Sequence, residues 1–160
     1  MAANRFTHVS IHAYDFEESL RFYEDVFGMR RVPSPDFSLP VEWLELGDQQ
    51  LHLFHSEDPA PRIHHIGLDV DDFEAVYRVA VERGLFDEDA FGAAVRELND
   101  GADQMYLRDP AGNLVEVNWP DASTLDRSVV TTITHVEDER PQSEEARRAT
   151  LYPVRIRQAD

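Results

Sequence analysis

The sequence predicts a mixed α+β protein built from two related β-α-β-β-β modules. One observation behind this prediction is an internal repeat, in which the stretch around His65 matches the stretch around His8 at a constant offset of 57 residues. Each copy is an alternating, strand-like stretch followed by an Asp, Asp15 or Asp72, that is placed to cap a helical pattern. The shared register indicates a duplicated module, although two short β-α junctions could also match by coincidence.

The first module is expected to span residues 5–56. Its elements are predicted as a strand, a helix and three strands, over residues 6–12, 16–27, 28–32, 41–46 and 50–55. Asp15 is followed by Glu18 at the spacing of a capping box, and Gly47-Asp48 is a hairpin signal between the last two strands. The module therefore has the order β-α-β-β-β.

The second module is expected over residues 62–119 and repeats that order. Its elements are predicted over residues 63–70, 72–83, 94–98, 104–108 and 113–119. Gly84 is placed to end the helix, and the turn formers from Asp109 to Asn113 are placed to join the last two strands. Residues 1–120 are thus expected to form a single domain of two modules.

Residues 121–160 do not repeat the pattern and are predicted to form a C-terminal arm. The arm is mostly polar, yet it carries a short apolar run over residues 129–133 and an alternating stretch over residues 151–156. Pro153 would confine a strand in that stretch to a sheet edge. We expect a homodimer, in which the arm packs against the partner subunit, or an arm that reaches back across its own domain.

Composition and charge exclude several classes of function. The 160 residues carry a formal net charge of −17, which argues against binding to nucleic acid or to an anionic membrane. This acidity is typical of a solvated surface, the alternative being a partner that binds acidic residues. Without cysteine, any metal must be held by His, Asp and Glu. No secretory signal or membrane span is visible, so we expect a cytoplasmic protein.

Four strands each offer one metal-ligand side chain opposite an apolar row. Alternation along the strands places these side chains on the non-core face. The candidate ligands are His8, His52, His65 and Glu116. Such a set suits Fe²⁺, which we favour, or Mn²⁺, Ni²⁺, Co²⁺ or Zn²⁺. Each histidine alone is more typical of a hydrogen-bonded or surface residue, whereas Glu116 between two valines favours a cation, because a carboxylate on a partly buried strand is costly.

The motif HVSI at His8, followed by DFEESLRFYEDVFGM from Asp15 to Met29, resembles the opening module of the vicinal oxygen chelate superfamily. That superfamily includes glyoxalase I, bleomycin and fosfomycin resistance proteins, methylmalonyl-CoA epimerase and extradiol dioxygenases. The resemblance covers residues 5–119. It implies curved mixed sheets around a metal-binding cavity, ligands from the first and last strands of each module, a small-molecule substrate and a homodimer.

Two local features bear on the reaction that the resemblance implies. Glyoxalase-like members commonly have Glu or Gln where this chain has His52, which weakens a glyoxalase assignment. The second module resembles the extradiol dioxygenase signature, because Tyr106 precedes Glu116 by ten positions with Pro110 and Gly112 between them. The histidine expected upstream is absent. Tyr106 is thus a candidate catalytic residue, the alternative being an ordinary half-buried strand tyrosine.

The leading functional prediction is a metal-dependent enzyme acting on a small molecule that chelates the metal through adjacent oxygens. Dioxygenase-type chemistry is preferred over glyoxalase- or epimerase-like lyase or isomerase chemistry. A second class is a bleomycin-resistance-type binding protein, and a third is a structural or regulatory dimer. The residues expected to line the cavity are His12, Trp43, Phe54, Asp69 and Asn118.

Overall fold

The computed structural model describes residues 5–152 and has the predicted mixed α+β class. It contains one sheet of four strands and one of five, both curved and open. By its internal contacts the chain forms two compact units. Of the described residues, the first unit comprises residues 5–66 and Arg108–Val115, and the second comprises Gly67–Leu107 and residues 116–152.

The four-stranded sheet of the first unit has the order β1-β4-β3-β2. Its strands are β1 His8–Ala13, β2 Arg30–Val32, β3 Val41–Leu46 and β4 Gln49–His55. β1 pairs in parallel with β4, whereas β3 is antiparallel to both β2 and β4. Gly47 has a positive φ of 58° in the β3–β4 turn, so the hairpin uses the residue best suited to that conformation.

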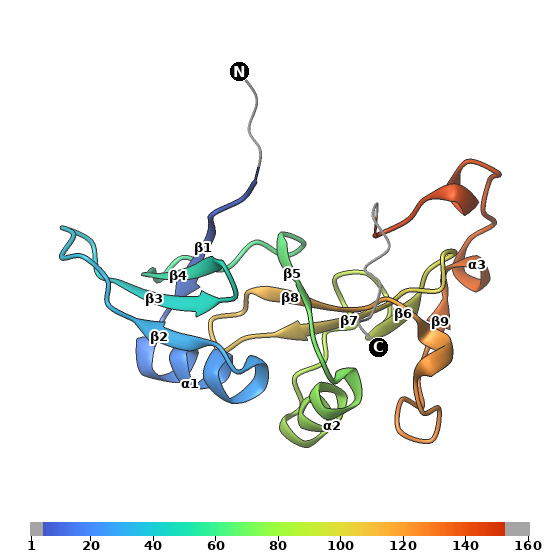
Figure 1. Ribbon diagram of the computed structural model, residues 1–160, viewed down its shortest axis with the longest axis horizontal. Coiled ribbons are helices and arrows are strands. Elements are labelled where there is room, and N and C mark those ends of the chain that lie inside the picture. The colour runs from blue at the N-terminus through green and yellow to red at the C-terminus, as the bar shows by residue number, and fades with distance from the viewer. Residues whose placement is uncertain (1–4, 153–160) are drawn as a thin grey trace. The chain divides into compact units, whose positions relative to one another are not determined.

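Helix α1, Phe16–Phe27, lies along one face of this sheet (Figure 1). The Asp15 side chain accepts a hydrogen bond from the backbone N–H of Glu18 at 3.0 Å, which caps the first turn. The helix ends at Gly28, whose φ of 62° is left-handed. Ser19, Leu20 and Tyr23 turn inward and are at most 2% exposed, so one helical face supplies much of the core of this unit.

The five-stranded sheet has the order β5-β8-β7-β6-β9. Its strands are β5 His65–Asp69, β6 Val95–Glu97, β7 Asp103–Arg108, β8 Leu114–Trp119 and β9 Thr134–His135. β5 alternates strictly, with Ile66 and Leu68 buried and the residues beside them exposed. In contrast, the first five residues of β7 and of β8 are buried on both faces. The two inner strands therefore form the most enclosed part of the sheet.

Helix α2, Phe73–Arg83, repeats the design of α1. The Asp72 side chain accepts from the backbone N–H of Ala75 at 2.8 Å, and Gly84 ends the helix with a φ of 63°. Its buried face consists of Phe73, Val76, Tyr77 and Ala80. The caps predicted from the repeat are confirmed at both helices. None of the helices within residues 5–152 is long and apolar enough to cross a membrane.

The C-terminal arm folds back onto the second unit, which is one of the two arrangements expected from the sequence. Its short strand β9 pairs in parallel with β6 at the edge of the sheet (Figure 1). A 3₁₀ turn at Ala122–Thr124 precedes it, and helix α3, Val136–Glu139, follows it. Ala122, Leu125 and Val130 are at most 7% exposed, so the arm buries apolar side chains within its own unit.

The arm differs from the prediction in the position of its strand. Residues 129–133 contain a turn and a bend followed by residues without regular secondary structure, and the strand pairing begins only at Thr134. An edge strand was expected over residues 151–156. Leu151 and Tyr152 are not in a strand, and the remaining four residues lie outside the described part of the chain.

Candidate functional site

Two of the four predicted metal ligands lie side by side in the first unit. The rings of His8 and His52 are stacked with their centroids 4.3 Å apart and their planes 14° from parallel. The ring of Trp43 also stacks on His52, with the centroids 4.4 Å apart and the planes 7° from parallel. The β3–β4 register explains this arrangement, because it sets Trp43 directly opposite His52.

The environment of His52 favours its neutral form. The residue is only 7% exposed, and its Nε2 lies 2.9 Å from Oε1 of Gln50. Burial lowers the pKa of His52, and charge on His8 lowers it further. The neutral imidazole is the form that binds metal ions or accepts a proton, so the stack prepares His52 for either role.

His65 opens β5 and is also part of the first unit. Its Nδ1 lies 3.0 Å from the backbone oxygen of Ile63. A histidine that ligates a metal usually fixes its ring by such a hydrogen bond from the second nitrogen to a carbonyl. The local geometry of His65 therefore suits the role predicted for it.

Glu116, the fourth predicted ligand, lies in the second unit on β8 and is 6% exposed. Gly67 of β5 is its neighbour: a Cβ added there would lie 3.6 Å from Oε1 of Glu116 and 3.2 Å from Nδ2 of Asn118. Because 3.2 Å is a tight contact, any side chain at position 67 would crowd Asn118. Gly67 is thus needed for space beside the carboxylate and not for an unusual backbone conformation.

Tyr106 of β7 lies close enough to Glu116, in the same unit, to feel its charge. It is 3% exposed, and its hydroxyl donates to Oε1 of Gln104 at 3.0 Å. Burial raises the pKa of Tyr106, and the nearby Glu116 carboxylate raises it further. The phenol therefore stays protonated at neutral pH and can act as a hydrogen-bond donor.

Three of the residues expected to line a cavity carry a buried polar atom that has no hydrogen-bond partner within residues 5–152. They are His12 (Nδ1) and Trp43 (Nε1) in the first unit and Asn118 (Oδ1) in the second. A buried polar atom without a partner is costly unless another group satisfies it. A bound ligand is one group that could supply the missing partner.

The metal site itself stays a prediction. His8, His52 and His65 belong to the first unit and Glu116 to the second. Within either unit, the described side chains include no group of three or more His, Asp or Glu residues placed to hold an ion. The donor chemistry nevertheless fits a divalent cation, because the set combines imidazoles with a buried carboxylate beside a glycine that leaves room.

The turn over residues 109–113, part of the segment that resembles the extradiol dioxygenase signature, makes several buried hydrogen bonds in the first unit. The Asp109 side chain accepts from the Tyr23 hydroxyl at 2.9 Å and from the Asn113 amide at 2.8 Å. Asn113 also donates to the backbone oxygen of His12 at 2.7 Å. The turn thereby fastens α1 and β1 together. Burial raises the pKa of Asp109, against the opposing effect of these donors.

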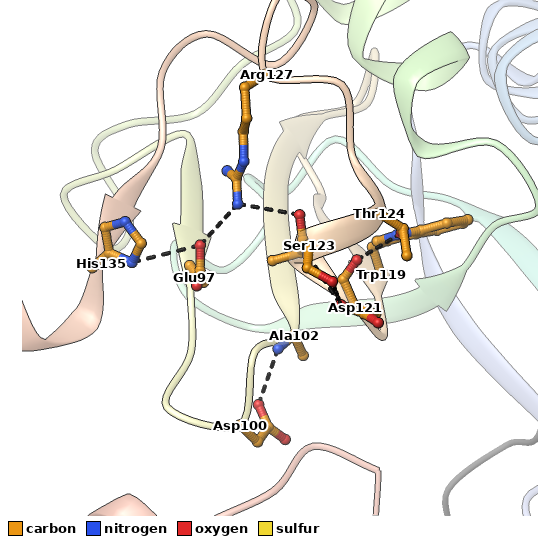
Figure 2. A network of polar contacts seen from close by, with 10 residues as sticks. Glu97, Asp100, Ala102, Trp119, Asp121, Ser123, Thr124, Arg127 and His135 are labelled. Atoms are coloured by element: carbon orange, nitrogen blue, oxygen red, sulfur yellow. Dashed lines mark hydrogen bonds and ion pairs between the residues drawn. The ribbon is translucent and has the colours of Figure 1, made fainter.

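A second ionisable cluster lies where the arm meets β6 (Figure 2). Arg127 donates to Glu97 at 3.0 Å and to the backbone oxygen of Ala122 at 3.2 Å, and His135 lies 3.5 Å from Glu97. Asp103 stands directly opposite Glu97 on β7 and is fully buried. In the described chain neither of its carboxylate oxygens has a hydrogen-bond partner. Burial, followed by the charge of Glu97, raises the pKa of Asp103 to about 6.

Comparison with known families bears directly on this architecture. The family model described as the Glyoxalase/Bleomycin resistance protein/Dioxygenase superfamily matches residues 5–117. The chain belongs to this superfamily. The match spans both predicted modules and ends before the arm, so the resemblance seen in the sequence is confirmed.

Individual superfamily members show where the similarity lies. Mitochondrial methylmalonyl-CoA epimerase of Mus musculus is 29% identical over 133 residues, covering 71% of each chain. Glyoxylase I 4 of Arabidopsis thaliana is 28% identical over 121 residues, covering 69% of this chain and 67% of that protein. The crystal structure of lactoylglutathione lyase from Agrobacterium tumefaciens has a TM-score of 0.50 at 27% identity, covering 74% of this chain and 95% of that one.

Sequence reasoning missed three features of the site region. Gly67 was placed on the polar face of β5 without a role, although a glycine inside an alternating strand is itself a signal of close approach. Asp103 lies just before the predicted strand 104–108 and had no predicted role, although the structure places it as a buried charge at the start of β7. No sequence pattern indicated that Tyr152 of the arm would donate to Asp69 of β5 at 2.7 Å.

Proposed function

We propose that this chain is a divalent-metal-dependent enzyme that acts on a small molecule with two adjacent oxygens. Membership of a superfamily whose members commonly use divalent metals supports the proposal. The observation that carries it is Glu116, a buried carboxylate that faces a protonated Tyr106 and is given room by Gly67. A buried carboxylate beside a phenol donor, on a strand face kept open by a glycine, can hold a cation together with a substrate oxygen.

The residues that would hold the metal are His8, His52, His65 and Glu116. When bound, the cation would polarise the adjacent oxygens of the substrate and stabilise negative charge that develops on them. The chain's own groups would do the rest. Tyr106 would donate a hydrogen bond to a substrate oxygen, and the unpartnered Asn118 Oδ1 would accept one from the substrate.

The first candidate reaction is a lyase or isomerase reaction that moves a proton beside a carbonyl group. The similarity to methylmalonyl-CoA epimerase and to lactoylglutathione lyase supports this class. Where glyoxalase-like members commonly have Glu or Gln, this chain has His52. In this candidate His8, His65 and Glu116 would hold the metal, and His52, whose neutral form is favoured by burial, would take up the proton instead of binding the cation.

The second candidate is dioxygenase-type cleavage with Fe²⁺, favoured by one specific observation. Tyr106 precedes Glu116 by ten residues, as in the extradiol signature, and the two side chains influence each other electrostatically. His8, His65 and Glu116 would then form the three-residue facial set typical of non-haem iron oxygenases. Tyr106 would donate to an oxygen of the bound substrate, as in the first candidate.

Metal analysis and substrate assays separate these candidates. Protein purified without chelators is expected to contain about one divalent metal per chain. It should then be loaded anaerobically with Fe²⁺, Co²⁺ or Zn²⁺ and assayed with methylmalonyl-CoA, lactoylglutathione and catechol. Oxygen uptake with catechol would select the dioxygenase, and turnover of either thioester without oxygen uptake would select the lyase or isomerase class.

Two glutamine variants test the role of Glu116 itself. Glu116→Gln keeps the shape of the side chain but removes the charge, so metal affinity should fall roughly 10- to 100-fold. Glu24→Gln, at an exposed position of α1, serves as the matched control and should bind like the wild type. Equal metal affinity of the wild type, Glu116→Gln and Glu24→Gln would refute the proposed site.

A further inference from the structure

The C-terminal arm is tied to the second unit at several successive points. Beyond β9, Glu139 forms an ion pair with Arg96 at 2.9 Å, and Asn99 donates to the backbone oxygen of Ala146 at 3.1 Å. The backbone N–H of Leu151 then donates to Asp100 at 3.0 Å. These contacts hold the arm against β6 and the loop after it. They thereby fix the position of the next residue, Tyr152.

Tyr152 reaches the polar face of β5. Its hydroxyl donates to Oδ1 of Asp69 at 2.7 Å, a short bond to a charged acceptor. Asp69 and Gly67 share one face of β5, because residues two apart in a strand point to the same side. Gly67 in turn adjoins the Glu116 carboxylate. The arm thus brings a phenol to the face that carries the candidate active-site carboxylate.

The electrostatic surroundings of Tyr152 agree with this placement. Burial raises its pKa, and the carboxylates of Asp69, Asp100 and Glu116 raise it further. Charge on Glu116 acts on Tyr152 and on Tyr106 alike. Both phenols therefore stay protonated at neutral pH, and they come from segments that are far apart in the sequence.

We propose that Tyr152 is a further substrate-binding residue, delivered by the C-terminal arm, whose hydroxyl transfers its hydrogen bond from Asp69 to an oxygen of the bound substrate. The substrate class rests on the proposed function: a small molecule with adjacent, partly negative oxygens. A donor from the arm and a second donor from Tyr106 would stabilise both oxygens. Because the family match ends at residue 117, this residue belongs to a part of the chain that the family pattern does not describe.

The first test compares two conservative variants of the full chain. Co²⁺ affinity is measured alone, and binding of 4-nitrocatechol to the Co²⁺-loaded protein is then followed by the absorbance of the probe. Tyr152→Phe should weaken 4-nitrocatechol binding roughly 5- to 30-fold while leaving Co²⁺ affinity unchanged. The matched control is Tyr14→Phe, which removes an exposed hydroxyl that donates to a backbone oxygen at 3.4 Å and should bind both as the wild type does.

A second measurement tests the placement of the arm without metal or substrate. In protein labelled with 3-fluorotyrosine, the ¹⁹F resonance of Tyr152 is the one lost in Tyr152→Phe. It should shift in Asp69→Asn, which changes its acceptor, and not in Asp36→Asn, at an exposed position far along the chain. An unmoved resonance in Asp69→Asn would overturn the proposal.

The outcomes distinguish this inference from the proposed function. Equal 4-nitrocatechol binding by the wild type and Tyr152→Phe would overturn the role of Tyr152 and leave the proposed function standing. Loss of both Co²⁺ and 4-nitrocatechol binding in Tyr152→Phe would show a structural effect on Glu116, and this too would overturn it. A wild type that binds Co²⁺ but no 4-nitrocatechol would refute the substrate class in the proposed function, and the substrate contact of Tyr152 with it.

Discussion

At the scale of a single residue, a glycine can be required either for the space around its Cα or for its backbone conformation, and Gly67 is an example of the first case. The six glycines with positive φ, such as Gly84, have no heavy atom near a notional Cβ, so only their conformation favours glycine. Gly67 is the reverse case, because its backbone is not left-handed and its Cβ position adjoins Asn118 and Glu116. Substitutions at these two types of glycine can be distinguished by measuring protein stability and metal binding separately.

Gly67→Ala and Gly84→Ala are therefore expected to have opposite effects. At position 67 the added methyl group should displace the Asn118 amide and lower metal affinity roughly tenfold, with little loss of stability. At position 84 the left-handed conformation should cost about 1–2 kcal/mol of unfolding free energy, with metal affinity unchanged. Urea unfolding and metal titration measure the two quantities. Unchanged metal binding in Gly67→Ala would mean that Asn118 relaxes without disturbing Glu116.

Asp103 is a residue whose charge opposes folding at neutral pH. Its pKa of about 6 in the folded protein lies above the ordinary value of 3.8, because burial and Glu97 disfavour the charge more than Arg127 and His135 favour it. A carboxyl group with a raised pKa stabilises the fold while it is protonated in both states. That contribution is lost as the pH rises from about 4 through 6.

Asp103→Asn should accordingly stabilise the protein at pH 7.5, on the order of 1–3 kcal/mol, by removing a buried charge that has no hydrogen-bond partner within residues 5–152. The gain should shrink as the pH falls through 6 and disappear near pH 4. Thermal unfolding across this range measures the effect, with the exposed Asp36→Asn as the matched control. An advantage that grew toward low pH would contradict the raised pKa.

At the scale of elements, the packing of α1 depends on one buried hydroxyl. Tyr23 is fully buried, and its hydrogen bond to Asp109 joins the helix to the turn between β7 and β8. Without that donor, Asp109 would keep the Asn113 amide and two backbone N–H donors but would lose one of the groups that offset its burial. The helix would then be held mainly by its apolar face.

Tyr23→Phe is expected to lower the free energy of unfolding by about 1–3 kcal/mol, since it leaves a buried carboxylate with one donor fewer. Urea unfolding with an unchanged m-value would attribute the loss to the native state. Tyr14→Phe, which removes an exposed hydroxyl, should stay within about 0.5 kcal/mol of the wild type. Equal stability of the two variants would show that the helix does not need this tie.

The arm offers a second test at the element scale, because two adjacent valines differ in burial. Val130 is 1% exposed, whereas Val129 is only half-buried. Val130→Ala should destabilise the protein by about 1–3 kcal/mol, and Val129→Ala by less than about 1 kcal/mol. Thermal unfolding of both variants measures the difference. Equal, small effects would mean that this part of the arm contributes nothing to the stability of the second unit.

At the scale of the whole molecule, the acidic charge bears directly on the homodimer expected from the sequence. A net charge of −17 repels other polyanions, so a dimer interface would have to be built from the less charged surfaces. Exposed apolar residues are available in the first unit, where Phe6 is 79% and Phe37 54% exposed. A homodimer, which the superfamily resemblance implies, would have such residues available for its interface.

The mass measured by light scattering is expected to rise with ionic strength toward a plateau at twice the mass of one chain. Salt should favour the dimer because it screens the repulsion between two acidic chains. Phe37→Ser is the informative variant, because an exposed aromatic residue at an interface contributes strongly to association. A monomer mass across the accessible concentrations would refute the homodimer expected from the sequence.

The fold class, the helix bounds and most strands could be predicted from the sequence because each depends on local rules. Asp15 and Asp72 cap their helices and Gly84 ends the second one as predicted, whereas Gly28, expected to open a strand, ends the first helix, and β2 begins only at Arg30. Alternation in β5 gave the correct faces for Ile66 and its neighbours, since strand geometry fixes the side-chain direction residue by residue. The internal repeat then gave the order of the elements in both modules.

Only the tertiary structure decided which side chains meet. The pairs Tyr23–Asp109 and Tyr152–Asp69 join residues more than 80 positions apart, and the buried charge of Asp103 depends on strands and arm packing around it. Such contacts depend on strand register and on the path of the arm, which no local pattern of hydrophobicity or capping encodes. The sequence by itself therefore determined the family and the candidate donors, and the three-dimensional packing decided which polar groups are buried, paired or left for a ligand.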